Sequence, residues 1–101
     1  MDIPHLGTPP ERIEAFCRRW KVSEFALFGS ILTDEFRPDS DVDVLVTFAG
    51  DAHWSLFDLS DMRDELMEMF GRQVDMVLKR ALRNPFRKER ILSTYQVIYA
   101  A

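Results

Sequence analysis

Leu27-Phe28-Gly29-Ser30, followed after ten residues by Asp41-Val42-Asp43, is the stretch of this sequence that most narrows its fold. Residues 25–28 form a short apolar run, which is typical of a strand covered on both faces. Gly29 ends that run, and we expect residues 30–36 to form a short helix or helical turn. A glycine lets a phosphate approach the backbone, and a helix N-terminus offers amide donors and the positive end of a dipole. This stretch therefore predicts a phosphate-binding turn after a buried strand.

Two aspartates begin the next predicted strand, Val42–Phe48, whose apolar residues alternate with a period of two. Asp41 and Asp43 share one face of that strand, with Cβ atoms roughly 6–7 Å apart. Two carboxylates on an otherwise apolar strand are costly unless a cation meets them, and divalent cations prefer oxygen ligands. Asp75 repeats the pattern inside a predicted strand over residues 73–78. If the two strands are neighbours, the three acids predict a site for two metal ions.

Two amphipathic helices flank these strands in the sequence. Thr8-Pro9-Pro10-Glu11 predicts a helix start with Thr8 as its N-cap. Apolar residues at helical spacing over 56–70 predict a second helix, which Gly71 ends. Both helices therefore carry an apolar face that a sheet can cover.

The C-terminal third is less regular. Residues 81–92 predict a helix, or a helix broken by Pro85, and residues 95–99 predict a last strand. With the strands above, the fold class is α+β or α/β: a small mixed β-sheet flanked by helices. The length of 101 residues favours one domain over residues 1–101.

Composition excludes several classes of protein. The net charge of −4 argues against direct binding of nucleic acid. No apolar run is long enough to span a membrane, and the single cysteine, Cys17, lies on a helix face as a core thiol. A lone thiol without a secretory signal fits a reducing compartment, so we expect a cytoplasmic protein.

The charges are unevenly distributed along the chain. Residues 1–70 hold 6 Lys and Arg against 15 Asp and Glu, whereas residues 71–101 hold 7 against 2. A basic segment after an acidic body favours an anionic ligand or an acidic partner surface. For each basic side chain taken alone, a solvated helix face is the simpler interpretation. The basic residues in question are Lys79, Arg80, Arg83, Arg87, Lys88 and Arg90.

The spacing of Gly29-Ser30 and Asp41-Val42-Asp43 resembles the nucleotidyltransferase superfamily that includes DNA polymerase β. The stretch 37–46 and its ten-residue spacer look like the minimal nucleotidyltransferase branch, and Val74-Asp75-Met76-Val77 matches the third acidic strand of that family. The resemblance covers the whole chain in the order of its elements. It implies the nucleotidyltransferase fold.

The resemblance also implies roles for individual residues. Asp41, Asp43 and Asp75 would be catalytic and would hold Mg²⁺, two ions being expected, with Asp75 on the side of the nucleophile. Gly29 and Ser30 would hold the triphosphate of ATP, the substrate. Many members carry basic or small residues directly after Gly-Ser, but here Ile31 and Leu32 follow. Arg37 is then a candidate phosphate partner, or a surface residue.

A chain of this length has no room for a separate acceptor domain, so its acceptor is expected on a partner protein. Minimal nucleotidyltransferases are typically antitoxins of a HEPN ribonuclease toxin, and the resemblance implies transfer of AMP to a toxin tyrosine. Two alternatives stay open. One is a non-catalytic antitoxin that neutralises the toxin by binding, and the other is a small-molecule, antibiotic-type nucleotidyltransferase.

Overall fold

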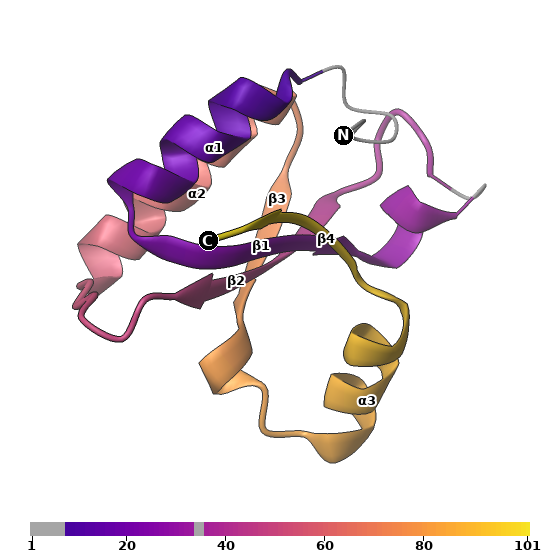
Figure 1. Ribbon diagram of the computed structural model, residues 1–101. Coiled ribbons are helices and arrows are strands. Elements are labelled where there is room, and N and C mark those ends of the chain that lie inside the picture. The colour runs from indigo at the N-terminus through magenta and orange to yellow at the C-terminus, as the bar shows by residue number, and fades with distance from the viewer. Residues whose placement is uncertain (1–7, 34–35) are drawn as a thin grey trace.

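A mixed four-stranded sheet organises the protein, whose computed structural model describes residues 8–33 and 36–101. The strands are β1 (Val22–Phe28), β2 (Val42–Phe48), β3 (Val74–Leu78) and β4 (Gln96–Ala100). Their order is β3-β2-β1-β4 (Figure 1). β1 is antiparallel to β2 and β4, whereas β2 and β3 are parallel. The mixed sheet confirms the predicted fold class.

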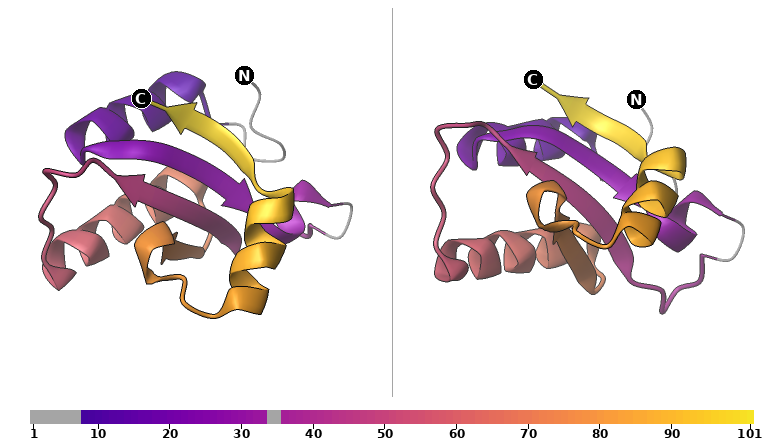
Figure 2. Two further views of the ribbon diagram at one scale, coloured as in Figure 1. Left: turned by 60° about the horizontal axis from the view of Figure 1, so that its bottom comes forward. Right: turned by 90° about the horizontal axis from the view of Figure 1, so that it is seen from below.

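The helices cover the two faces of the sheet unequally. α1 (Pro10–Arg19) and α2 (Leu56–Phe70) lie together on one face, and α3 (Pro85–Thr94) lies on the other (Figures 1 and 2). Two short 3₁₀ turns complete the described elements: η1 (Gly29–Leu32) and η2 (Lys79–Ala81). α2 is the crossover that parallel strands require, since it connects β2 to β3.

The main core lies between the sheet and the pair α1 and α2. Cys17 of α1 and Met62 of α2 are fully buried there, and burial raises the pKa of the Cys17 thiol to about 12. A second, smaller cluster joins Ala26 of β1 and Leu45 of β2 to Ile91 of α3. Neighbouring residues of β1 therefore face different clusters, and all four residues from 25 to 28 are buried, as predicted.

The cap of α1 differs from the prediction. Thr8 does not cap the helix, because Pro9 occupies the N-cap with extended backbone and Pro10 is the first helical residue. Thr8 is buried, and its hydroxyl donates to the carbonyl of Met69 at the end of α2. The prediction was wrong because Thr8 lies one residue too far from the first turn; its hydroxyl serves tertiary packing instead.

The two ends of α2 agree with the prediction. Ser55 and Asp58 form a reciprocal capping box at its start, and Gly71 takes the left-handed conformation at its end. No helix of residues 8–33 and 36–101 has both the length and the apolar composition to cross a bilayer.

The C-terminal third folds as the broken alternative predicts. A continuous helix over 81–92 is not formed, because η2 ends at Ala81 and α3 begins only at Pro85. Asn84 is the N-cap of α3, and its side chain accepts hydrogen bonds from two backbone N–H groups of the first turn. The helix predicted over residues 30–36 is the single turn η1, while residues 34–35 lie outside the described residues.

Candidate active site

The register of the parallel strands brings the three predicted acids to one place. Asp43 of β2 is directly opposite Asp75 of β3, and Asp41 precedes Asp43 by two residues. All three therefore share the face on which α3 lies, since Leu45, two residues further along β2, contacts the cluster that includes α3. Asp41 and Asp75 are exposed, and Asp43 is partly buried. Sequence could propose this neighbourhood but could not establish which strands pair.

Gly29 lies directly beneath the carboxylate of Asp43. The register pairs Phe28 with Asp43, so the chain leaves β1 beside this acid. A Cβ atom at position 29 would lie 2.2 Å from Asp43 Oδ2, far inside van der Waals contact, and the residue has φ +81°. Only glycine meets both conditions, because other residues are strained at such φ and carry the Cβ. The Gly-Ser motif and the Asp-x-Asp motif are thus in direct contact.

Asp43 occupies an electrostatically unfavourable position. Burial raises its pKa, and the negative charges of Asp75 and Asp41 raise it further, while the Arg87 guanidinium lowers it. The two acids and the arginine are therefore close enough to act on one carboxylate. A pKa raised in this way is typical of functional carboxylate clusters.

The donor set of the three acids suits magnesium. Carboxylate oxygens are the ligands that this hard cation prefers, and a positive ion would offset the repulsion at Asp43. Within residues 8–33 and 36–101, no three His, Cys, Asp or Glu side chains already converge in the geometry of a metal site.

A cleft of about 740 Å³ opens beside Gly29, between the end of β1 and α3. Its walls include Gly29 and Phe28 on one side, and Arg87 and Arg90 on the other. This volume falls within the usual range for small-molecule sites, roughly 300–1,000 Å³. This cleft therefore reaches Gly29, the residue on which the Asp43 carboxylate packs.

Arg37 lies in the loop before Asp41, away from this cleft. Its backbone N–H donates to Ser40 Oγ at 2.9 Å, and its carbonyl accepts from Arg72 Nη1 at 2.7 Å. The Arg37 guanidinium has no hydrogen bond or ion pair within the described part of the chain. Its predicted role in phosphate binding stays a prediction, because the structure does not place it against a ligand pocket.

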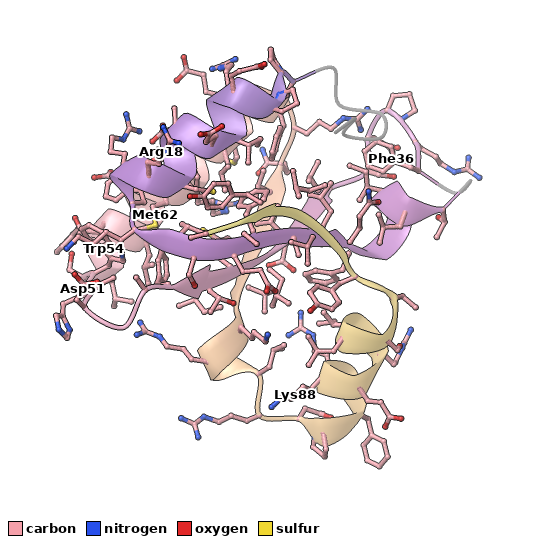
Figure 3. The ribbon with its side chains drawn as sticks, in the orientation of Figure 1. Arg18, Phe36, Asp51, Trp54, Met62 and Lys88 are labelled. Carbon is pink, nitrogen blue, oxygen red and sulfur yellow. The ribbon has the colours of Figure 1, made fainter. Side chains whose placement is uncertain are left out.

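Arg72 fixes the same loop. Its Nη1 also donates to the carbonyls of Pro38 at 3.1 Å and Ser40 at 3.3 Å, and its guanidinium lies 4.3 Å from the centre of the Phe36 ring. Figure 3 shows Phe36 at one end of the molecule and Trp54 at the other. The site lies at the Phe36 end, where β2 begins.

With this geometry established, comparison with known proteins identifies the family. A family model described as a nucleotidyltransferase domain matches residues 11–98. The chain belongs to the nucleotidyltransferase family. Protein adenylyltransferase MntA of Thermococcus cleftensis is 36% identical to it over 70 residues, which are 69% of each chain. The predicted enzyme class, a nucleotidyltransferase, is confirmed.

Solved structures give the same result for the fold of this nucleotidyltransferase. One that is provisionally named a minimal nucleotidyltransferase is 31% identical, with a TM-score of 0.74 over 95% of each chain. This likeness supports the prediction that the chain belongs to the minimal nucleotidyltransferase branch of the family.

Two toxin–antitoxin structures share the fold at lower identity. One, crystallised with AMP-PNP, has a TM-score of 0.73 at 18% identity over 91% of this chain and 73% of the other. The second is a tri-AMPylated HEPN toxin of Shewanella oneidensis in complex with an MNT antitoxin, with a TM-score of 0.66 at 17% identity over 91% and 70%. At these identities the likeness shows the nucleotidyltransferase fold.

Sequence reasoning missed the individual importance of two arginines in this nucleotidyltransferase. Arg87 was only one of several basic residues, yet its charge acts on Asp43 and it lines the cleft. Arg72 was not singled out. A signal for Arg87 does exist in the sequence: Ile91 follows it by four residues, so an apolar contact to the sheet would place Arg87 one turn away on the same side.

Proposed function

We propose that this nucleotidyltransferase is a Mg²⁺-dependent antitoxin that transfers AMP from ATP to a tyrosine hydroxyl of a partner HEPN toxin. The observation that carries the proposal is the packing of the Asp43 carboxylate on Gly29, opposite Asp75. This contact joins an acidic cluster suited to a divalent cation to a turn suited to a phosphate. The relative named a protein adenylyltransferase and the tri-AMPylated HEPN toxin complex support the transfer of AMP to a HEPN partner, and the AMP-PNP complex supports an ATP-type substrate.

In the proposed reaction, the tyrosine oxygen attacks the α-phosphorus of ATP, the bond from that phosphorus to the bridging oxygen breaks, and pyrophosphate leaves. Asp41, Asp43 and Asp75 would hold the magnesium, which would lower the negative charge on the phosphates and acidify the attacking hydroxyl. Asp75 accepts the proton of that hydroxyl. Gly29 leaves room for the triphosphate, and the backbone N–H groups and the hydroxyl of Ser30 donate to its oxygens.

Two hollows lie near the acids. The cleft of about 740 Å³ adjoins Gly29, and a second hollow of about 420 Å³ adjoins Asp41 and Gln73 on another side. Asp41 and Asp75 are exposed, so a side chain of a partner protein has access to them. This arrangement suits an enzyme whose acceptor is carried by another protein.

The test is transfer of label from α-³²P-ATP to the proposed HEPN toxin partner, in the presence of Mg²⁺. We expect labelled toxin with the wild-type protein and loss of at least about 100-fold in the Asp41→Asn, Asp43→Asn double variant. Asp51→Asn is the matched control, because Asp51 is an exposed acid paired with Lys21, beyond the opposite end of β2.

Chelation of the metal with EDTA should abolish labelling, and added Mg²⁺ should restore it. Transfer to toxin lacking its acceptor tyrosine should be absent. A tight complex with the toxin but no label transfer would leave the non-catalytic antitoxin as the correct function. Labelling that persists in the double variant would show that these acids are not the catalytic group.

A further inference from the structure

The basic residues of the C-terminal third are not equivalent in the structure. Arg72 donates to backbone carbonyls, and Lys79 lies 3.9 Å from Glu24. The remaining five have no ion pair or side-chain hydrogen bond to any residue in the described ranges; these are Arg80, Arg83, Arg87, Lys88 and Arg90. Only Arg87 and Arg90 of these line the cleft beside Gly29. These two are therefore the cations available to a ligand there.

The walls of the cleft favour an anion. Two arginines and no acid line it, although Glu89 lies between them in the sequence. Arg87 and Arg90 are three residues apart in α3, so their side chains leave the helix on one side. Guanidinium groups match phosphate oxygens in a planar, bidentate geometry, and they keep their charge at any physiological pH. The chemistry of this wall is that of a phosphate-binding surface.

The packing of α3 fixes where the arginines lie. Ile91 is the buried residue of this helix and contacts the cluster on the sheet that includes Phe28. Asn84 fixes the first turn, since its side chain accepts from the N–H groups of Phe86 and Arg87. Anchored at both points, α3 holds Arg87 and Arg90 across the cleft from Gly29.

We propose that Arg87 and Arg90 bind the phosphates of the nucleoside triphosphate, which lies in the cleft between β1 and α3 with the acids at its other side. This inference rests on the proposed function and adds two substrate-binding residues and the place of the nucleotide. The triphosphate would then lie between a metal-binding cluster and a guanidinium wall, so that cations meet its oxygens from two sides. The Arg87 guanidinium also acts on the acidic cluster, because its charge lowers the pKa of Asp43.

The test measures equilibrium binding of ATP to the isolated chain by titration calorimetry, with Mg²⁺ present and no partner protein. Arg87→Gln and Arg90→Gln should each weaken binding by about 10-fold or more, because each loses charge-assisted hydrogen bonds. Tripolyphosphate should show the same losses, since the arginines act on the phosphates. Arg87→Lys should restore only part of the affinity, because an ammonium ion cannot bind two oxygens in the same plane.

Arg80→Gln is the matched control. Arg80 is also an exposed arginine of the basic segment, but it lines a separate hollow with Thr47 and His53, towards the other end of β2. We expect its affinity for ATP to stay within twofold of the wild type. Melting temperatures of all variants verify that the fold is intact.

Unchanged affinity for ATP in an intact Arg87→Gln, Arg90→Gln double variant would overturn the inference. So would a double variant that binds ATP normally and loses only its complex with the toxin, since the arginines would then serve the partner. The proposed function fails separately: wild-type protein that binds ATP through these arginines but transfers no AMP would contradict the activity and support the nucleotide site.

Discussion

At the scale of single residues, Asp43 carries most of the consequences of the site. It is partly buried, it faces Asp75 across the sheet register, and its carboxylate covers Gly29. Partial burial and the charge of Asp75 disfavour the ionised carboxylate of Asp43 when no cation is bound. A bound cation would offset this cost. The residue is thus placed for binding at a cost to the free protein.

The raised pKa of Asp43 predicts a pH-dependent gain in stability for Asp43→Asn in metal-free buffer. Because the folded pKa lies above the unfolded value of 3.8, protonation favours the folded state, and this contribution is lost as the pH rises through the folded pKa. Asparagine mimics the protonated form at every pH. Urea unfolding in EDTA should therefore give a higher midpoint for the variant at pH 7, and equal midpoints below pH 3.8. Equal urea midpoints for the variant and the wild type at pH 7 would contradict the predicted destabilisation by the ionised Asp43 carboxylate.

Gly29→Ala should damage both stability and activity. The new Cβ would lie 2.2 Å from Asp43 Oδ2 in a residue with φ +81°, so we expect a loss of about 1–3 kcal/mol and little transferase activity. Gly71→Ala separates the backbone strain from the steric clash, because φ is +66° but no atom lies within 4 Å of the added Cβ. This variant should lose about 1 kcal/mol of stability. Gly50→Ala has neither problem and should stay within about 0.5 kcal/mol. Chemical denaturation compares all three.

At the scale of elements, the crossover through α2 assembles the site. Asp43 and Asp75 come together only because α2 carries the chain from the end of β2 back to the start of β3. Arg63 of α2 adds to this, as its Nε donates to the carbonyl of Val74 at 2.9 Å. The helix thus positions the strand that brings the third acid.

Ser55→Ala should lower stability by about 1 kcal/mol without affecting the chemistry. The Ser55 hydroxyl accepts from the Asp58 N–H at the start of α2, and alanine leaves that donor without its cap. Ser60→Ala is the control, because Ser60 is exposed inside the same helix and should change stability by less than about 0.5 kcal/mol. Thermal melts measure both, and an equal loss in the two variants would argue against the capping box.

The elements differed in how far they could be predicted. The bounds of β2 and α2 were predictable, because strict alternation marks the first and an apolar face closed by Gly71 marks the second. The cap of α1 was not, since the burial of Thr8 depends on Met69 in another helix. The strand order was also beyond local patterns, because pairing between β2 and β3 is a long-range property. For the same reason the motif predicted the acids, whereas the position of Arg87 required the packing of α3.

At the scale of the whole molecule, the single cysteine reports on folding. Cys17 is fully buried and its pKa is about 12, so both shielding and protonation make the native thiol unreactive at neutral pH. A thiol reagent should modify the native chain at least about a thousand times more slowly than the urea-unfolded chain. Absorbance with an aromatic disulfide reagent follows this reaction. Rapid modification without denaturant would show that α1 opens locally.

The guanidinium of Arg72 has a mechanical consequence. It donates to the carbonyls of Arg37, Pro38 and Ser40, which lie in the loop before Asp41. Arg72 itself lies directly after Gly71, between α2 and β3, so its side chain connects that turn to the loop. The N–H of Val42 also donates to the carbonyl of Gln73, so the entries to β2 and β3 are joined twice. We therefore expect the loop before Asp41 and the turn before Asp75 to move as one rigid body. A force applied to that loop by a docking protein would displace two of the three acids together, with their mutual spacing preserved.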